Sequence, residues 1–404
     1  MEHKKISRIR FLVLGAVVFC LVAGAGATLY VADGIHYPDP EGEYQVGRTK
    51  LFLTDQSRAE TFSENPDDKR ELPVTIYYPA AIGEDDRRST FASKAVGEVI
   101  AAYNGLPTVL LDTLKLNSFV DPKPVAGEQF PVLLFSGGLY GQAPFYGSLL
   151  ESIASEGYIV VAVEHPYSEI ITETSDGSLI RYNDQGTAFF DKETDNEKLD
   201  EYGSALADVW TADMLYVFDN LSELQAKHSI LAGSMNLEKT GIFGHSFGGA
   251  TTVSCLQERP ELVAGINMDG SLFGQQKTNP VYQPIVFMNS SQGAVIGAIF
   301  FQEKVVASQT SEACYHMMLM NSTHDSFATD SGLLYDKYPF ARPPDAAQIN
   351  GREALSDLSF YITAFFDQYI LGQSQDIFDL GYSEQHLQIM SAKYDTKQQS
   401  TVEE

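Results

Sequence analysis

The order of apolar and polar positions along the chain predicts strands alternating with helices. Short, almost wholly apolar runs bounded by glycine or polar residues are typical of strands buried on both faces; they cover residues 130–138, 158–165, 240–245, 262–269, 284–290 and 315–321. Helical spacing of apolar residues is found at 143–157, 206–224, 248–259, near 294–310 and at 352–370. This alternation predicts an α/β fold with a mostly parallel sheet and helices on both faces. Sites in such sheets form at the carboxyl ends of the strands.

The segment at residues 84–127 departs from this pattern. A strand with alternating apolar positions is expected just before it, at residues 71–80. The segment itself combines a charged stretch, a helix-like stretch and an apolar stretch. We interpret it as an insertion, which either caps a site or forms a peripheral subdomain. Residues 33–404 are otherwise expected to form one domain, because α/β folds of this length are common.

The N-terminus has the pattern of a membrane segment. Residues 11–32 carry no charge, and basic residues precede them: Lys4, Lys5, Arg8 and Arg10. A bilayer span needs about 20 apolar residues, and a basic flank stays in the cytoplasm. Residues 1–32 are therefore expected to be a transmembrane anchor. A cleaved signal peptide is the alternative, since Ala-Gly-Ala precedes Thr28. Both interpretations place the folded domain outside the cytoplasm, at the cell membrane or secreted.

Charge and cysteine content exclude several classes of function. The formal net charge is -27, which disfavours a nucleic-acid partner because phosphates would be repelled. Cys255 and Cys314 are interpreted as buried free thiols, with a disulfide between them left open as an alternative. The sequence has no Cys-x-x-Cys motif and no His/Cys cluster with ligand spacing. We therefore expect neither a metal nor a cofactor.

A candidate nucleophile lies between the apolar run at 240–245 and the helical segment that follows. The residues there are Gly244-His245-Ser246-Phe247-Gly248. A G-x-S-x-G motif between a strand and a helix is typical of a nucleophile elbow, a sharp turn that lifts the serine hydroxyl above the sheet. The His245 side chain should point away from this hydroxyl. The alternative is an ordinary glycine-rich turn that happens to contain Ser246.

A serine nucleophile needs a base and a carboxylate that orients the base. His324 follows the last predicted strand, which fits the chain order serine, acid, histidine; His165 comes too early and is expected to line a pocket floor or to structure a loop. The run at 284–290 ends without an acid, and the next acid, Glu303, lies well into a predicted helix. Asp269 ends the run before it and is therefore the expected acid, with Asp325 as the weaker alternative.

The oxyanion formed during attack needs backbone N–H donors. One is expected from Phe247, the residue after the nucleophile. The other should come from the loop after the run at 130–138, where Leu139 is the first choice and Tyr140 the second. Paired glycines in this loop are also what an ordinary tight turn would contain.

These motifs together resemble one lipase family. The residues around Ser246, the Met-Asp-Gly-Ser-Leu-Phe stretch at Asp269 and the Ser-Thr-His-Asp-Ser-Phe stretch at His324 are similar to platelet-activating factor acetylhydrolases of the plasma and intracellular type II classes. The resemblance covers about residues 70–370 and implies an α/β-hydrolase fold. It also implies a calcium-independent serine esterase that removes short or oxidised acyl chains from the second position of glycerophospholipids. One departure is Gly137, where the family usually has a histidine.

The expected function is therefore hydrolysis of short-acyl phospholipid esters. A broader carboxylesterase is one alternative, and a cutinase or polyester hydrolase, which would place its acid after the later strand, is another. A surface binding module with a hydrolase fold is the alternative without catalysis. It would require that one member of the Ser246, Asp269 and His324 set had been lost.

Overall fold

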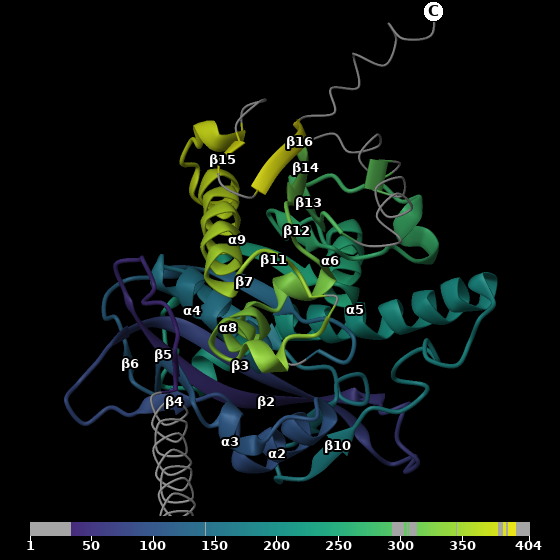
Figure 1. Cartoon of the computed structure of the whole chain (residues 1–404), viewed down its shortest axis with the longest axis horizontal. Coiled ribbons are helices and arrows are strands. Elements are labelled where there is room, and N and C mark those ends of the chain that lie inside the picture. Colours follow the sequence, from purple (N-terminus) through teal and green to yellow (C-terminus); the bar gives the residue numbers. More distant parts are fainter. Residues whose placement is uncertain are drawn as a thin grey trace, which may run out of the picture.

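A computed structural model of the chain describes residues 34–141, 143–292, 303–304, 306, 313–344, 346–378, 383–384 and 387–392 (Figure 1). The predicted anchor or signal segment, residues 1–32, lies outside the described residues. Across the described ranges, none of the helices combines the length and the apolar character that a bilayer crossing requires. The predicted helix near 294–310 also lies largely outside them, with helical backbone described at 303–304 and 306.

The centre of the sheet consists of neighbouring parallel strands in the order β8-β7-β11-β12-β13-β14. These strands are β7 (Phe130–Ser136), β8 (Ile159–Val163), β11 (Met235–His245), β12 (Gly265–Met268), β13 (Ile285–Ser290) and β14 (Cys314–Leu319). Each overlaps one of the apolar runs, although β11 begins before the predicted run at 240–245, so the existence of these strands is confirmed. Nearly all of their side chains are buried, as expected when helices cover both faces of a parallel sheet.

The outer parts of the sheet contain antiparallel pairs, so the complete sheet is mixed. The flanking strands are β1 (Ile35–His36), β2 (Gln45–Ala59), β3 (Lys69–Ala81), β4 (Arg88–Thr90), β5 (Leu114–Val120), β6 (Lys123–Pro124), β15 (Ser383–Glu384) and β16 (Leu387–Ala392), and a separate pair is formed by β9 (Ile171–Glu173) and β10 (Leu179–Arg181). Strand β3 pairs antiparallel with both β2 and β8, and β16 pairs antiparallel with β14. The loop at residues 60–68 joins β2 to β3, and a connection of this length is too short for the crossover that a parallel pair requires. The prediction of a mostly parallel sheet therefore holds for the central strands alone.

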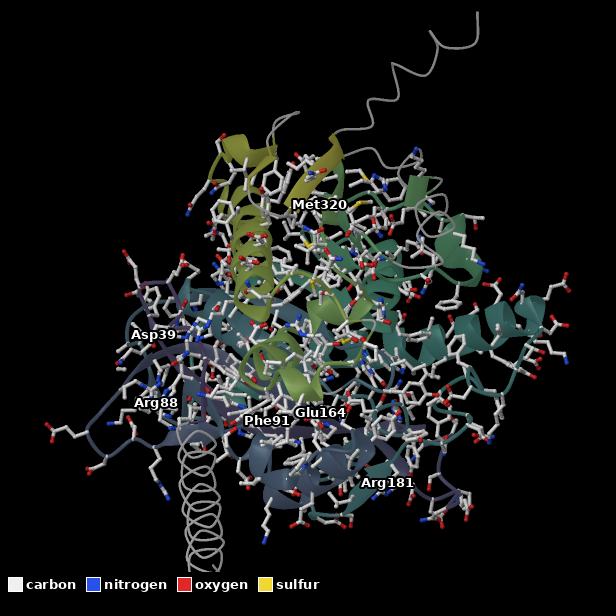
Figure 2. All side chains as sticks on the ribbon, viewed as in Figure 1. Asp39, Arg88, Phe91, Glu164, Arg181 and Met320 are labelled. Atoms are coloured by element: carbon white, nitrogen blue, oxygen red, sulfur yellow. The ribbon has the colours of Figure 1, made fainter. Side chains whose placement is uncertain are left out.

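Helices cover both faces of the central strands, as predicted. One face carries α4 (Gly147–Ser155), α8 (Thr329–Lys337) and α9 (Gly351–Phe366), and the other carries α5 (Asn196–Lys227) and α6 (Phe247–Glu258). Strand β7 shows how the two cores separate: Leu133 and Phe135 pack with the first group, and Val132 and Leu134 with the second. Figure 1 shows α9 and α5 on opposite sides of the strands, and side chains fill the space between helices and sheet in Figure 2.

Several short helical turns complete the chain. They are η1 (Ala143–Tyr146), η2 (Gly274–Lys277), η3 (His324–Phe327), η4 (Pro339–Ala341), the π-turn η5 (Asp367–Leu371) and η6 (Asp376–Phe378). The helix predicted at 352–370 is therefore α9 followed by η5. Cys255 and Cys314 are both buried and free, which answers the open question of a disulfide. Burial raises the pKa of both thiols, so they remain protonated.

The segment at residues 84–127 becomes part of the edge of the sheet. It contains β4, β5 and β6 together with α2 (Lys94–Tyr103) and α3 (Thr108–Leu111), and β5 pairs parallel with β2. Phe91, labelled in Figure 2, is buried and its ring lies edge-on to that of Phe145, with centroids 5.3 Å apart. The segment thus packs against η1, which follows the loop after β7. Its role as a cap stays a prediction.

Candidate active site

Ser246 occupies a sharp turn between β11 and α6, as the elbow motif predicts. Its backbone has φ 56° and ψ -120°, a conformation that non-glycine residues rarely adopt. The flanking glycines are required by close backbone contacts: a Cβ at Gly244 would lie 2.3 Å from the carbonyl oxygen of Gly248, and a Cβ at Gly248 would lie 2.2 Å from that of Ser136. The alternative of an unspecialised glycine turn does not explain this strained geometry.

The three residues predicted as a catalytic set come together at neighbouring strand ends. His324 Nε2 lies 2.8 Å from Ser246 Oγ, and His324 Nδ1 lies 2.7 Å from Asp269 Oδ2. Asp269 follows β12 directly, and His324 opens η3 after β14. The Asp269 side chain is 4% exposed and that of His324 is 48% exposed, so the histidine is reachable from solvent while the carboxylate is not.

The end of strand β13 supports Asp269 instead of supplying an acid of its own. Ser290 donates to this carboxylate twice, from its backbone N–H and from Oγ, each over 2.9 Å. Burial raises the pKa of Asp269, but the hydrogen bonds from His324 and Ser290 outweigh it and hold the pKa below its ordinary value. The carboxylate is therefore ionised and able to orient the imidazole.

The charge state of His324 reflects the carboxylates around it. Burial lowers its pKa, whereas the hydrogen bond and charge of Asp269 and the charge of Asp325 raise it, and the net direction is upward. Asp325, the weaker candidate for the acid, thus acts on the ring through its charge. The hydrogen bond to Nδ1 comes from Asp269.

The loop after β7 passes directly against the nucleophile. A Cβ at Gly138 would lie 3.0 Å from that of Ser246. The Gly138 amide donates to Tyr146 Oη over 3.1 Å, and the Tyr140 amide donates to the Ser168 carbonyl over 2.9 Å. Both are thereby engaged, which corrects the second choice of Tyr140 as an oxyanion donor. The amides of Leu139 and Phe247 remain the candidates.

His245, which was expected to point away from the Ser246 hydroxyl, is in contact with Tyr146 of η1. Its Nδ1 lies 2.8 Å from Tyr146 Oη, which donates to it while accepting from Gly138. Burial lowers the pKa of His245 well below its ordinary value, and the neighbouring His324 adds to this effect, so the ring is neutral. The two imidazoles lie with centroids 4.5 Å apart. His245 therefore ties the elbow to the loop at Gly138.

Sequence reasoning missed Ser290, Tyr146 and Asp213, whose side chains form hydrogen bonds in the interior of the fold. Ser290 could have been found by asking what occupies the strand end where an acid is absent. Asp213 also carried a signal, because a carboxylate on the buried face of a predicted helix, between Trp210 and Met214, needs a partner. No sequence pattern indicates the role of Tyr146.

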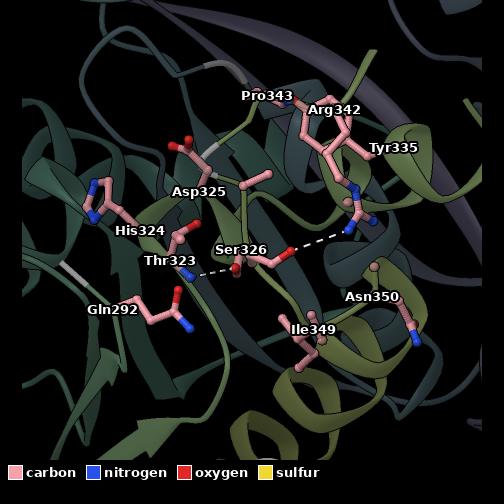
Figure 3. Close-up of a pocket in the computed structure, with 15 residues that line it drawn as sticks. Gln292, Thr323, His324, Asp325, Ser326, Tyr335, Arg342, Pro343, Ile349 and Asn350 are labelled. Carbon is pink, nitrogen blue, oxygen red and sulfur yellow. Dashed lines mark hydrogen bonds between the residues drawn. The ribbon is translucent and has the colours of Figure 1, made fainter. Parts of the chain in front are cut away.

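A cavity of about 400 Å³ opens beside His324 (Figure 3). Its walls come from the segments after β13 and β14, from α8 and from the start of α9 with the residues before it, and include Gln292, Tyr335, Arg342 and Ile349. Arg342 is bound to Asp336 over 3.0 Å at the far wall. Within the described ranges no group of three His, Cys, Asp or Glu side chains forms a metal site.

Comparison with known proteins places this arrangement in a family. A probable 1-alkyl-2-acetylglycerophosphocholine esterase of Arthroderma benhamiae is 29% identical over 283 residues, covering 65% of this chain and 66% of its own. A platelet-activating factor acetylhydrolase of Cavia porcellus is 28% identical over 269 residues, covering 63% and 60%. The chain thus spans less than two thirds of the length of these relatives.

A solved structure shows the same fold. A ferulic acid esterase from Streptomyces cinnamoneus superposes with a TM-score of 0.74 at 20% identity, covering 89% of this chain and 100% of that one. The family described as platelet-activating factor acetylhydrolase, isoform II, matches residues 30–337. Because this match spans most of the chain, including Ser246, Asp269 and His324, the protein belongs to the platelet-activating factor acetylhydrolase, isoform II, family.

Proposed function

We propose that this protein is a serine ester hydrolase in which Ser246 is the nucleophile, His324 the general base and Asp269 the acid. The observation that carries the proposal is the continuous hydrogen-bonded chain from Asp269 through His324 to Ser246. Ser246 Oγ attacks the ester carbonyl while its proton passes to His324 Nε2. The imidazolium then protonates the leaving alcohol, and water, activated by the same ring, hydrolyses the acyl-enzyme.

The oxyanion is held by the amides of Leu139 and Phe247 in this proposal. Two observations support these donors: the neighbouring amides of Gly138 and Tyr140 are engaged elsewhere, and Phe247 is the first residue of α6. The positive end of the dipole of α6 adds to the stabilisation of negative charge at this point.

The substrate class follows from the family. One relative is named as an esterase of 1-alkyl-2-acetylglycerophosphocholine, and the other is named as a platelet-activating factor acetylhydrolase. We propose that this chain likewise cleaves short or oxidised acyl groups from the second position of phospholipids, without calcium. Cleavage by the proposed residues needs no metal, because His324 activates the nucleophile and backbone amides hold the oxyanion.

Gly137 supports the alternative of a broader carboxylesterase or a cutinase-like range of esters. A Cβ at this position would lie 3.2 Å from the Tyr146 ring, so the histidine usual in the family would press on the residue that holds Gly138. Glycine lets the loop pack directly against the buried Tyr146 ring. The alternative of a binding module without catalysis is disfavoured because all three predicted catalytic residues are present and in contact.

We also propose that residues 1–32 direct the domain across a membrane, where it remains anchored or is released. The support is the uncharged run at 11–32 behind a basic flank. The lipid surface would then bring the ester substrate to the enzyme.

Replacing Asp269 tests the catalytic assignment. Asp269→Asn should lower kcat for p-nitrophenyl acetate by about 10⁴-fold with little effect on the fold, because the amide no longer stabilises the imidazolium. A fluorophosphonate probe, which reacts with nucleophilic serines, should label Ser246 in the wild-type protein. Asp325→Asn is the matched control and should keep most of the turnover. Equal losses in both variants, or a folded wild-type protein that takes no label, would contradict the assignment.

The acyl range is tested by a chain-length series of esters that includes an acetylated ether phospholipid. We expect kcat/KM to fall as the acyl chain lengthens beyond a few carbons. Gly137→His should lower kcat for every ester in the series, because its side chain would displace Tyr146, which holds the loop at Gly138. A preference for long acyl chains would contradict the proposal of acetylated phospholipids as substrates, but it would remain consistent with a serine esterase.

The pH dependence of kcat/KM reports the pKa of His324, which must be neutral to accept the Ser246 proton. Activity should rise with pH through an inflection above the ordinary histidine pKa of about 6.5, because Asp269 and Asp325 stabilise the charged ring. Asp325→Asn removes one of these charges and should move the inflection to lower pH. The exposed Asp219→Asn, remote from the site, should leave it unchanged. An inflection that stays in place in Asp325→Asn would show that this charge is screened.

The N-terminal proposal is tested by the mass of the mature protein's first peptide. An anchored form should retain residues 11–32 and partition with membranes, whereas a processed form should begin near Thr28 and be released. A mature protein found in the cytoplasm with an intact N-terminus would refute both forms.

A further inference from the structure

A second Ser–His–Asp chain lies beneath the candidate active site. Ser136 Oγ lies 3.0 Å from His165 Nε2, and His165 Nδ1 lies 2.8 Å from Asp213 Oδ2. All three residues have 0% exposure. No ester can reach Ser136, so this chain is not a second catalytic site despite its similar geometry. Its position requires another explanation.

The charged end of this chain is fixed by two arginines. Arg70 binds Asp213 through two hydrogen bonds, of 3.1 Å from Nε and 2.6 Å from Nη2, and Arg58 adds a third of 2.6 Å. Burial raises the pKa of Asp213, but Arg70 and His165 outweigh it and keep the carboxylate ionised. Arg70 is completed by an ion pair with Glu60 over 2.7 Å. Because each of these buried charges is paired, the Asp213 carboxylate is held in a fixed position.

The proton positions along the chain are also determined. Burial lowers the pKa of His165, so the ring is neutral. Its Nδ1–H therefore donates to Asp213, and its Nε2 accepts from the Ser136 hydroxyl. Each group is either a donor or an acceptor, so the hydrogen bonds from Asp213 to Ser136 have one stable arrangement. Ser136 is the last residue of β7 and lies directly before the loop at 137–141.

The same histidine is connected to the other end of that loop. The Trp210 ring stacks on His165 with centroids 3.8 Å apart, and its Nε1–H donates to Ser168 Oγ over 3.1 Å. The Ser168 carbonyl accepts from the Tyr140 amide over 2.9 Å. The loop that carries Leu139 is therefore held on one side through Ser136 and on the other through Ser168.

The second candidate oxyanion donor touches the same group of side chains. The edge of Trp210 meets the Phe247 ring, with centroids 4.9 Å apart and an interplanar angle of 74°. Phe247 is buried, so its ring is confined by this contact. Trp210 thus contacts Phe247 itself, and through Ser168 and His165 it is connected to the loop that carries Leu139.

We propose that Arg70, Asp213, His165, Ser136 and Trp210, the buried network, position the amides of Leu139 and Phe247 for oxyanion binding. These are positioning residues, and their role rests on the proposed esterase function. Oxyanion donors act only when they lie at hydrogen-bonding distance from the place where charge develops. A network that sets the height of the loop over Ser246 therefore acts on the transition state more than on substrate binding.

The test removes the link between the network and the loop. Ser136→Ala deletes one buried hydroxyl; its matched control is Ser234→Ala, which deletes a buried hydroxyl bound to the Leu231 carbonyl near the opposite end of β7. With p-nitrophenyl acetate, kcat per fluorophosphonate-titrated site should fall about 10-fold in Ser136→Ala, with KM unchanged within about 2-fold. The Ki of a trifluoromethyl ketone, whose adduct oxygen occupies the oxyanion hole, should rise in parallel. Ser234→Ala should change neither value.

A second pair of variants covers the case in which Ser136→Ala fails to fold. Trp210→Phe keeps an aromatic ring beside His165 but removes the donor to Ser168, and its control is Tyr78→Phe, which removes a buried donor to the Pro122 carbonyl. We expect the same loss of kcat and the same rise in Ki in Trp210→Phe alone. Equal kcat and Ki in each variant and its control, or a change in KM alone, would overturn the proposal. So would a fluorophosphonate label on Ser136. A wild-type protein without turnover would instead refute the esterase itself, and the positioning role with it.

Discussion

The site depends on the close approach of three backbone segments around the elbow. The end of β11, the start of α6 and the end of β7 come so near each other that a side chain at Gly244 or Gly248 would overlap neighbouring carbonyl groups. Hydrogen bonds complete the confinement, because the Ser246 amide donates to the Met268 carbonyl over 2.8 Å. This packing holds Ser246 at positive φ, which turns its hydroxyl out of the sheet. A relaxed turn would return the hydroxyl to the sheet and separate it from the imidazole.

The register of the parallel strands then determines which side chains the hydroxyl meets. Gly244 and His245 of β11 lie opposite Asn267 and Met268 of β12, so Asp269 emerges level with the elbow. Strand β13 is aligned with β12 in the same way, which brings Ser290 against the Asp269 carboxylate. The acid Asp269 thus follows β12, one strand earlier than is usual. Strand β13, after which the acid more often lies, supplies Ser290 as a hydrogen-bond donor to Asp269. The cost of burying it is offset by three hydrogen bonds.

Buried charge has a different role on the other side of the loop. Removing an ion pair such as Arg70–Asp213 from water is costly, and hydrophobic replacements are often as stable. A purely structural core would not need it. In the proposed network, the Arg70–Asp213 pair fixes the tautomer of His165. The ring of His165 in turn fixes the orientation of the Ser136 hydroxyl. The catalytic histidine differs in being 48% exposed, with a raised pKa, where His165 is buried and neutral.

The sequence alone determined the alternation of elements, the elbow and the chemistry of its residues, because burial on both faces and tight turns impose patterns that local residues must carry. It therefore predicted the central strands, Ser246, His324 and, through the missing acid after β13, Asp269. The antiparallel pairs in the outer sheet, the support from Ser290 and the network from Arg70 to Ser136 were decided by tertiary structure. Arg70 and Asp213 stand 143 positions apart, and no local pattern records that they meet. Contacts of this kind exist once the sheet register and the helix packing have brought distant segments together.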